Sequence, residues 1–319
     1  MGLDTASIKF ACAAKSLGVD FSNSLMLGRQ RLLADASALQ EVFAIHGINL
    51  RATEFLHANK YGEKFFSLLG AHEINSMDYS SYEGATILHD LNSPIPADLN
   101  QRFSVVYDGG TIEHIFNVPQ ALKNCMEMVQ VGGHFLQVNI ANNYMGHGFW
   151  QFSPELLFRV FSPANGYEVK IVLLHEVVSQ RAWYVVSDPD QVHQRVTLCN
   201  SNPTYILTIA KRIAKCEIFS QPPLQSDYSA AWDRSDRASR TRREQSPPAS
   251  NSNPEGQISK KIAQKFRLRR YLSKSVEKPL GVICHRALAL KTALTRTSPF
   301  DRPYYRRISE YKLVRGMLE

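Results

Sequence analysis

The stretch Phe103-Ser-Val-Val-Tyr-Asp-Gly-Gly-Thr-Ile-Glu-His-Ile-Phe-Asn-Val-Pro-Gln-Ala-Leu122, followed shortly by Val131-Gly-Gly-His-Phe-Leu136, decides the fold of this 319-residue chain. Its first apolar run has the length of a strand and ends at Asp108. Apolar residues then recur at helical spacing over 118–129, and a second strand pattern covers 134–140. A strand, a helix and another strand in this order indicate a parallel sheet that is covered by helices.

The same alternation extends on both sides of this unit. The patterns predict strands at 24–27, 73–77, 85–88, 167–177 and 205–213, and helices at 32–43, 52–69 and 154–161. The last two strands have no clear helix between them, but bracket an insertion, 178–203, with a further strand at 183–186. We therefore expect an α/β, Rossmann-like three-layer sandwich with a mostly parallel, seven-stranded sheet and an antiparallel edge strand.

Composition divides the chain into three parts. The residues from Ile218 onward carry 21 of the 37 basic and 9 of the 29 acidic residues. This part therefore has a charge of about +12 and the preceding part about −4, so the excess positive charge lies in the tail. Residues 221–256 are rich in Pro, Ser, Asn and Arg and poor in aliphatic residues. We predict an α/β domain over 1–217, a disordered linker over 218–257 and a basic helical tail over 258–319.

Cysteine usage and hydropathy indicate the setting of the protein. Five cysteines lie at spacings that suggest no disulfide pairing or zinc motif, which favours a reducing environment. We find no signal peptide and no apolar stretch long enough to span a bilayer. We therefore expect a cytoplasmic protein. The basic tail could bind nucleic acid or an anionic membrane surface, but a solvated basic helix is the favoured interpretation.

Acidic residues end three successive predicted strands or the loops after them. Asp78, Asp90 and Asp108 occupy these positions. Because the carboxyl ends of parallel strands meet at one edge of a sheet, these side chains are expected to converge on one crevice. The alternative for each is a carboxylate that caps a helix or a turn.

The motif around Asp108 resembles that of the class I S-adenosylmethionine-dependent methyltransferases. The features that carry the resemblance are a strand ending in Asp108, the pair Glu113-His114, a helix with Ala121-Leu122 and a Gly-Gly turn before the next strand. With the surrounding elements the resemblance covers roughly 20–217. It implies S-adenosylmethionine as the cofactor.

The resemblance also assigns cofactor-binding residues. It implies that Asp78 holds the ribose hydroxyls, that Asp90 accepts a hydrogen bond from the adenine, and that Asp108 and Gly109 face the methionine part. Gly28 would lie beside that part in the first turn, although this turn departs from the glycine-rich pattern of the family. Its Arg29 either pairs with the cofactor carboxylate or obstructs the crevice.

Candidate catalytic residues lie in the two loops that follow Asp108 and the 134–140 strand. A base is needed only if the acceptor keeps its proton at neutral pH. His114 is the first candidate, with Glu113 and His147 beside it; the alternative for His114 is a capping or packing histidine. Further polar candidates in the second loop are Asn142, Asn143 and Tyr144. We expect no metal site, because Glu113-His114 and His89-Asp90 are adjacent pairs rather than spaced ligand sets.

Two functions are therefore open. The first is a methyltransferase that acts on a small molecule or a glycan. The second is a methyltransferase-like binding or scaffold module that has lost its cofactor, which the poor glycine content of the first turn favours. Because one fold hosts many activities, the site must decide between them.

Overall fold

The computed structural model describes residues 2–178, 182–232, 305–309, 312–313 and 315–317. The chain divides into two units. The first comprises Met1–Val196, Ser201–Asp227 and Pro303–Glu319, and the second comprises Thr197–Asn200 and Tyr228–Arg302. Most of the second unit, and with it most of the predicted linker and tail, lies outside the described residues. The elements below belong to the first unit.

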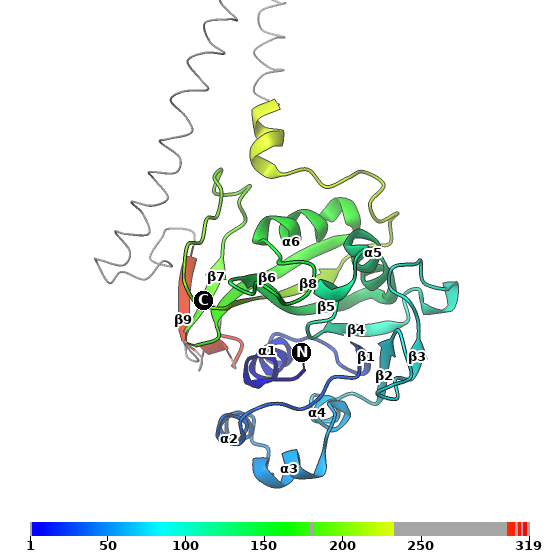
Figure 1. Ribbon diagram of the computed structural model, residues 1–319, viewed down its shortest axis with the longest axis vertical. Coiled ribbons are helices and arrows are strands. Elements are labelled where there is room, and N and C mark those ends of the chain that lie inside the picture. The colour runs from blue at the N-terminus through cyan, green and yellow to red at the C-terminus, as the bar shows by residue number, and fades with distance from the viewer. Residues whose placement is uncertain (1, 179–181, 233–304, 310–311, 314, 318–319) are drawn as a thin grey trace, which may run out of the picture. The chain divides into compact units, whose positions relative to one another are not determined.

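The first unit is built on a nine-stranded sheet (Figure 1) with the order β3-β2-β1-β4-β5-β8-β6-β7-β9. The pairs from β3 to β5 are all parallel, whereas β8 runs antiparallel to both β5 and β6. The pairs β6·β7 and β7·β9 are also antiparallel. The strands are β1 (Asn23–Leu27), β2 (Glu73–Asp78), β3 (Ile87–Leu88), β4 (Phe103–Asp108), β5 (Val129–Asn142), β6 (Tyr167–Glu176), β7 (Ala182–Val186), β8 (Thr204–Arg212) and β9 (Tyr305–Ser309).

Helices cover both faces of this sheet and complete three layers (Figure 1). One layer contains α1 (Thr5–Ser16), α2 (Ala36–Ile45), α3 (Ala52–Ala58) and α4 (Glu63–Leu68), and the other contains α5 (Val118–Met128) and α6 (Pro154–Val160). Short 3₁₀ turns are η1 (Ala97–Leu99), η2 (Ile112–His114) and η3 (Pro163–Asn165). The predicted Rossmann-like sandwich is thereby confirmed.

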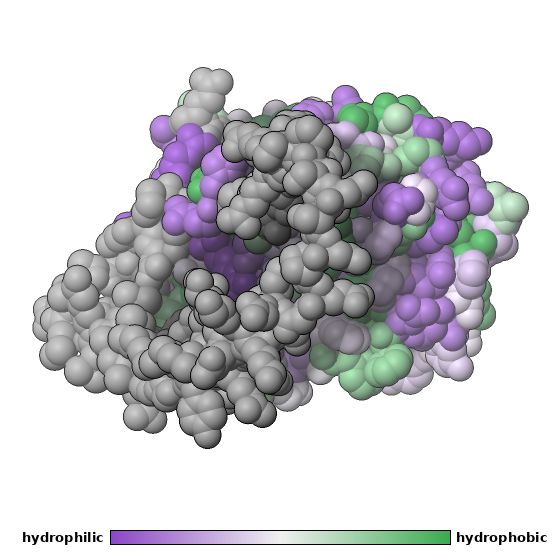
Figure 2. All heavy atoms as spheres, turned by 90° about the horizontal axis from the view of Figure 1, so that it is seen from above, coloured by the Kyte–Doolittle hydropathy of each residue, from purple (hydrophilic) through white to green (hydrophobic). Residues whose placement is uncertain are grey.

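Burial on both faces explains the near-continuous apolar character of the central strands. Every residue of β4 is buried. Val105 and Tyr107 pack in the same core as α1, whose Phe10 is fully buried. Val106 and Asp108 lie on the opposite face, toward the α5 and α6 layer, because side chains alternate along a strand. From the α6 side, hydrophilic and hydrophobic residues are interspersed over the visible surface (Figure 2).

Caps set several helix starts. Ser153 caps α6 with Pro154 at its first position, as the sequence predicted, and Asn117 caps α5. Asp4 and Asp35 cap α1 and α2. Among the described residues, no helix combines the length and the hydrophobicity needed to cross a bilayer.

The structure corrects the prediction in several places. The sheet has nine strands rather than seven, and its antiparallel part extends over β8, β6, β7 and β9 instead of a single edge strand. The predicted helix 52–69 is two short helices, because the chain leaves helical geometry at Asn59, which is extended. Gly132 and Gly133 lie inside β5 rather than in a turn before it. Within the predicted helical tail, residues 305–309 form β9 and pair with β7.

Candidate functional site

The carboxyl-terminal edge of the parallel strands brings four loops together. The register pairs Leu27 of β1 with Met77 of β2 on one side and with Asp108 of β4 on the other. Gly28 therefore begins its turn between the ends of β2 and β4. The predicted site residues all lie in the turns at this edge or at the strand ends that lead into it.

Two of the three predicted acidic side chains remain accessible at this edge. Asp78 is half-buried, and the hydrogen bond that it accepts from the Ser80 backbone N–H is long, at 3.4 Å. Asp90 accepts hydrogen bonds at one oxygen from the backbone N–H and the side chain of Asn92. These bonds lower the pKa of Asp90, which is therefore ionised at neutral pH. Both carboxylates can accept further hydrogen bonds from a ligand.

Asp108 has a different environment from the one that the sequence suggested. Its side chain is fully buried on the face that α5 covers, and its oxygens accept hydrogen bonds from the backbone N–H groups of Thr111 and Ile112 and from the Asn139 amide. Burial raises the pKa of Asp108 to about 7, although these hydrogen bonds act in the opposite direction. The side chain thus holds the turn that leads to η2.

The space between Gly28 and Gly109 contains a side chain of the protein itself. Gln30 folds back so that its Nε2 donates a hydrogen bond to the Leu27 carbonyl. A β-carbon built at Gly109 would lie 2.5 Å from the Gln30 Oε1, and one built at Gly28 would lie 3.5 Å from the Nε2. Gln30 is only 3% exposed, and its Oε1 has no hydrogen-bond partner within the described part of the chain. This glutamine therefore fills the methionine end of the predicted crevice.

Contacts with three other residues hold the Arg29 side chain. Its Nε lies 2.6 Å from the Glu63 carboxylate, its guanidinium stacks over the Tyr61 ring at 4.2 Å, and it donates a hydrogen bond to the Glu83 carbonyl. These contacts tie the first turn to the start of α4 and to the loop between β2 and β3. The guanidinium thus already has an acidic and an aromatic partner within the protein.

The three predicted catalytic residues come together in space. Glu113 and His114 lie on η2, and His147 lies in the loop after β5. One donor atom from each residue lies within 4.8 Å of the other two. The Nε2 of His147 is 3.7 Å from a Glu113 oxygen, and the two imidazole rings meet edge to face with centroids 5.0 Å apart.

The backbone fixes this cluster. Phe149 N–H donates to the Glu113 carbonyl at 2.8 Å, and a β-carbon at Gly148 would lie 2.8 Å from the same carbonyl. Gly148 also has a φ of 67°, so the close approach and the backbone conformation both require glycine. The two loops are therefore joined directly behind the functional side chains.

Burial dominates the electrostatics of the cluster. It raises the pKa of Glu113 to about 8, and the charge of the nearby Asp108 acts in the same direction. Burial lowers the pKa of His114, as does the charge of His147, and burial also lowers the pKa of His147. In the protein alone, both imidazoles are neutral at pH 7, and each has a nitrogen that can accept a proton or a metal ion.

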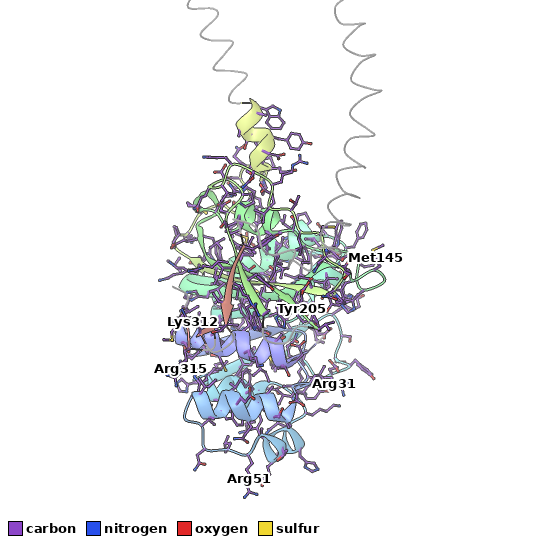
Figure 3. All side chains as sticks on the ribbon, turned by 90° about the vertical axis from the view of Figure 1, so that its left-hand side faces the viewer. Arg31, Arg51, Met145, Tyr205, Lys312 and Arg315 are labelled. Carbon is purple, nitrogen blue, oxygen red and sulfur yellow. The ribbon has the colours of Figure 1, made fainter. Side chains whose placement is uncertain are left out.

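Exposed aromatic residues surround the cluster. Phe116 packs edge to face on Phe149 at 6.0 Å and is tilted against Trp150 at 6.5 Å. Phe116 and Phe149 are 72% and 68% exposed. Met145, at 90% exposure, projects from the periphery of the same loop (Figure 3). The rim can therefore stack against a flat or apolar part of a ligand.

A cavity of about 310 Å³ lies on the α1 side of this edge. It is lined by polar groups from the starts of α1 and α2 and by side chains from β6, β7 and β8; they include Asp4, Lys9, Asp35, His175, Trp183 and Tyr205. Tyr205 (Figure 3) stacks on Tyr144 at 5.6 Å, and Tyr144 in turn meets the His147 ring edge to face. Two tyrosines thus connect the cavity to the histidine cluster.

Sequence reasoning missed two groups of residues at this site. Gln30 was given no role, and no local signal shows that its amide turns back onto Leu27. The second group consists of buried polar residues on the α5 side of β5 and β8: Gln137, Asn139 and Thr208, each with at least one atom that lacks a hydrogen-bond partner among the described residues. The alternation Gln137-Val-Asn139 was a signal for them, but it is typical of a half-exposed strand.

Comparisons with known proteins identify similar folds only. No protein-family model matches the chain, and no curated protein is similar to it in sequence. Among solved structures, a putative methyltransferase from Bacillus halodurans is 10% identical, with a TM-score of 0.36, over 63% of this chain and 99% of that one.

Two further solved structures show the range of the similarity. The 1,6-didemethyltoxoflavin-N1-methyltransferase of Burkholderia thailandensis, with bound 1,6-didemethyltoxoflavin and S-adenosylhomocysteine, is 11% identical with a TM-score of 0.33, over 65% of this chain and 80% of that one. The branched-chain polyamine synthase of Thermus thermophilus is 13% identical with a TM-score of 0.34, over 69% and 61%. At these values the similarity identifies neither a ligand nor a reaction. The strand order and the two helical layers themselves give the chain the Rossmann-like fold expected from its resemblance to class I methyltransferases.

Proposed function

We propose that this chain is an S-adenosylmethionine-dependent methyltransferase that acts on a small molecule or a glycan. The observation that carries the proposal is the gathering of Glu113, His114 and His147 at the same sheet edge as the accessible carboxylates Asp78 and Asp90. We assign the carboxylates to nucleoside binding and the cluster to proton transfer, and both lie at the position where open α/β sheets bind ligands.

The nucleoside half of the edge fits the cofactor better than the methionine half. The Asp78 carboxylate is free to accept two ribose hydroxyls, and Asp90 has an oxygen that can accept from the adenine amino group. Asp108 would act indirectly, by holding the turn. At the methionine end, Gln30 must swing out of the space beside Gly28 and Gly109 before a ligand can enter.

The cofactor supplies an already activated methyl group, so the residues of this chain have to align the acceptor, exclude water and accept a proton. His114 is exposed on η2 and can reach an acceptor hydroxyl or amine, while His147 and the Glu113 carboxyl restrict its position. The rim formed by Phe116, Phe149 and Trp150 would cover the apolar face of the acceptor or of a sugar ring.

Calorimetry with S-adenosylhomocysteine on the full chain tests this proposal. Losing two hydrogen bonds to a charged acceptor, each about 1.5 kcal/mol or more, should weaken binding by about 100-fold in Asp78→Ala. Asp98→Ala is the matched control, because this exposed aspartate lies in η1 between β3 and β4. The proposal fails if the wild type gives no heat at about 1 mM ligand, or if both variants bind like the wild type.

A second function is favoured by one specific observation, which is the Gln30 side chain in the crevice. A binding or scaffold module would keep the fold and use the rim aromatic residues for its partner without any cofactor. In that case Asp78→Ala would leave the biological activity intact, and Phe149→Ala would abolish it. The module is excluded if Asp78→Ala abolishes the biological activity and Phe149→Ala leaves it intact.

A further inference from the structure

Three side chains with metal-binding donor atoms lie together on η2 and in the loop after β5. Glu113 offers a carboxylate, and His114 and His147 each offer an imidazole nitrogen, all within 4.8 Å of one another. Two imidazoles and one carboxylate form a donor set that suits divalent first-row transition metals. The sequence did not predict this metal site, because Glu113 and His114 are adjacent and the third donor, His147, lies 33 positions after His114.

Three polar atoms of this cluster are buried without a hydrogen-bond partner among the described residues. Both oxygens of Glu113 are buried without a hydrogen-bond partner among the described residues, and the residue is 0% exposed. The His147 Nε2 is also buried and without such a partner. Its 3.7 Å separation from the Glu113 oxygen is too long for a hydrogen bond. A carboxylate in this position is unfavourable unless a cation or a proton compensates it.

The distances allow coordination after a modest closure. Ligand atoms bound at about 2.1 Å in tetrahedral geometry lie about 3.4 Å apart. The His147 to Glu113 separation of 3.7 Å is already close to this value, and the widest separation in the cluster is at most 4.8 Å. His114 is exposed on the short η2 turn and can rotate inward, whereas the Phe149 N–H bond to the Glu113 carbonyl keeps the other two residues in place.

We propose that Glu113, His114 and His147 form a binding site for one divalent transition-metal ion, with Zn²⁺ as the probe. Three protein ligands leave a coordination position open, as in catalytic rather than structural sites. The open position would take an oxygen or nitrogen atom of the acceptor, and the ion would then perform the activation that the proposed function assigns to His114. Metal binding at this site would not require the cofactor, since the three donors all come from the protein.

Metal titration of the full chain tests the site directly. The protein is stripped with a chelator and titrated with Zn²⁺ by calorimetry, and the zinc environment is then measured by X-ray absorption. We expect one bound ion with two nitrogen ligands and one carboxylate oxygen from the protein at about 2.0–2.2 Å. Mg²⁺ should not compete, because it prefers an all-oxygen shell.

Variants separate this site from other histidines and cysteines that bind zinc. Glu113→Gln, His114→Ala and His147→Ala should each weaken the one-ion site by about tenfold or more, whereas His72→Ala, an exposed histidine just before β2, should not change it. Because His114 is exposed, its replacement leaves the core intact even if Glu113→Gln impairs folding. The proposal is overturned if the three variants bind zinc like the wild type, or if sulfur ligands appear in the absorption spectrum.

The outcome is distinguishable from a failure of the proposed function. Zinc binding without S-adenosylhomocysteine binding keeps the metal site and removes the methyltransferase. The reverse result keeps the methyltransferase and returns the proton-accepting role to His114.

Discussion

Replacing Gln30 by alanine should strengthen the binding of S-adenosylhomocysteine. In the structure, Gln30 occupies the space beside Gly28 and Gly109, and its Nε2 bonds to the Leu27 carbonyl. A ligand in the crevice must first break this hydrogen bond, which is worth about 1 kcal/mol net. Removing the side chain removes that cost, so the dissociation constant should fall by about fivefold.

The same substitution should destabilise the fold only slightly. Leu27 keeps a second hydrogen bond on its carbonyl, from the Thr111 hydroxyl at 2.8 Å, so no backbone acceptor is left unpaired. We expect a loss of about 1 kcal/mol in the free energy of unfolding in urea. Calorimetry of Gln30→Ala should be compared with Gln40→Ala, whose Nε2 likewise donates to a backbone carbonyl, that of Leu50.

Each result has a definite meaning. Tighter binding in Gln30→Ala but not in Gln40→Ala supports a side chain that must leave before the ligand enters. Weaker binding in Gln30→Ala refutes this reasoning, because Gln30 would then be a ligand contact. If neither the wild type nor the variant binds S-adenosylhomocysteine, the crevice is not a nucleoside site. The binding or scaffold module is then the function that remains.

Two further predictions concern the scaffold of the site. Arg212 donates from one nitrogen to three carbonyls at the end of α5, those of Met126, Glu127 and Val129. Arg212→Met should therefore lower the free energy of unfolding by about 2–4 kcal/mol in a urea titration. An unchanged midpoint and slope of the urea transition would contradict this. Burial and, to a lesser extent, the charges of Lys211 and Lys170 lower the pKa of His134 to about 4. Between pH 4 and about 6.5 the unfolded chain therefore binds more protons than the folded chain, so the free energy of unfolding falls as the pH drops through this range. Because the ring keeps some contact with solvent, we expect His134 to lower the free energy of unfolding by about 1–2 kcal/mol across this range. His134→Asn should show a correspondingly flatter pH dependence in the same urea titration. Parallel curves for the two proteins would contradict this expectation.

The parts of the fold with a clear period were predictable from the sequence, and the parts without one were not. β4, α5 and the Ser153 cap of α6 follow from apolar spacing and turn residues. The helix α1 was not assigned, because every residue from Ala6 to Ala14 is buried, which removes the exposed polar face on which helical periodicity depends. β9 was not assigned, because it lies in a basic segment and only two of its five residues, Tyr305 and Ile308, are buried.

At the site, positions were predictable but side-chain directions were not. The parallel sheet brings Glu113, His114 and His147 together regardless of local detail, since the loops after adjacent strands share one edge. Whether Asp108 faces a ligand or the interior depends on packing against α5 and on Asn139, 31 positions away. Arg29 likewise finds Glu63 and Tyr61 through the tertiary fold, which no local pattern encodes.

The buried polar atoms at this edge argue that the sequence is not optimised for stability alone. Gln30, Glu113, Gln137, Asn139 and Thr208 each keep at least one buried atom without a hydrogen-bond partner among the described residues. Buried polar groups are normally paired, and a scaffold could replace these side chains by apolar ones of similar size at little cost. Because these five residues lie beside the ends of β1 and β4 and the neighbouring parts of β5 and β8, we attribute their unpaired atoms to a function that needs polar groups there: a proton acceptor, a metal ion or ordered water beside a ligand.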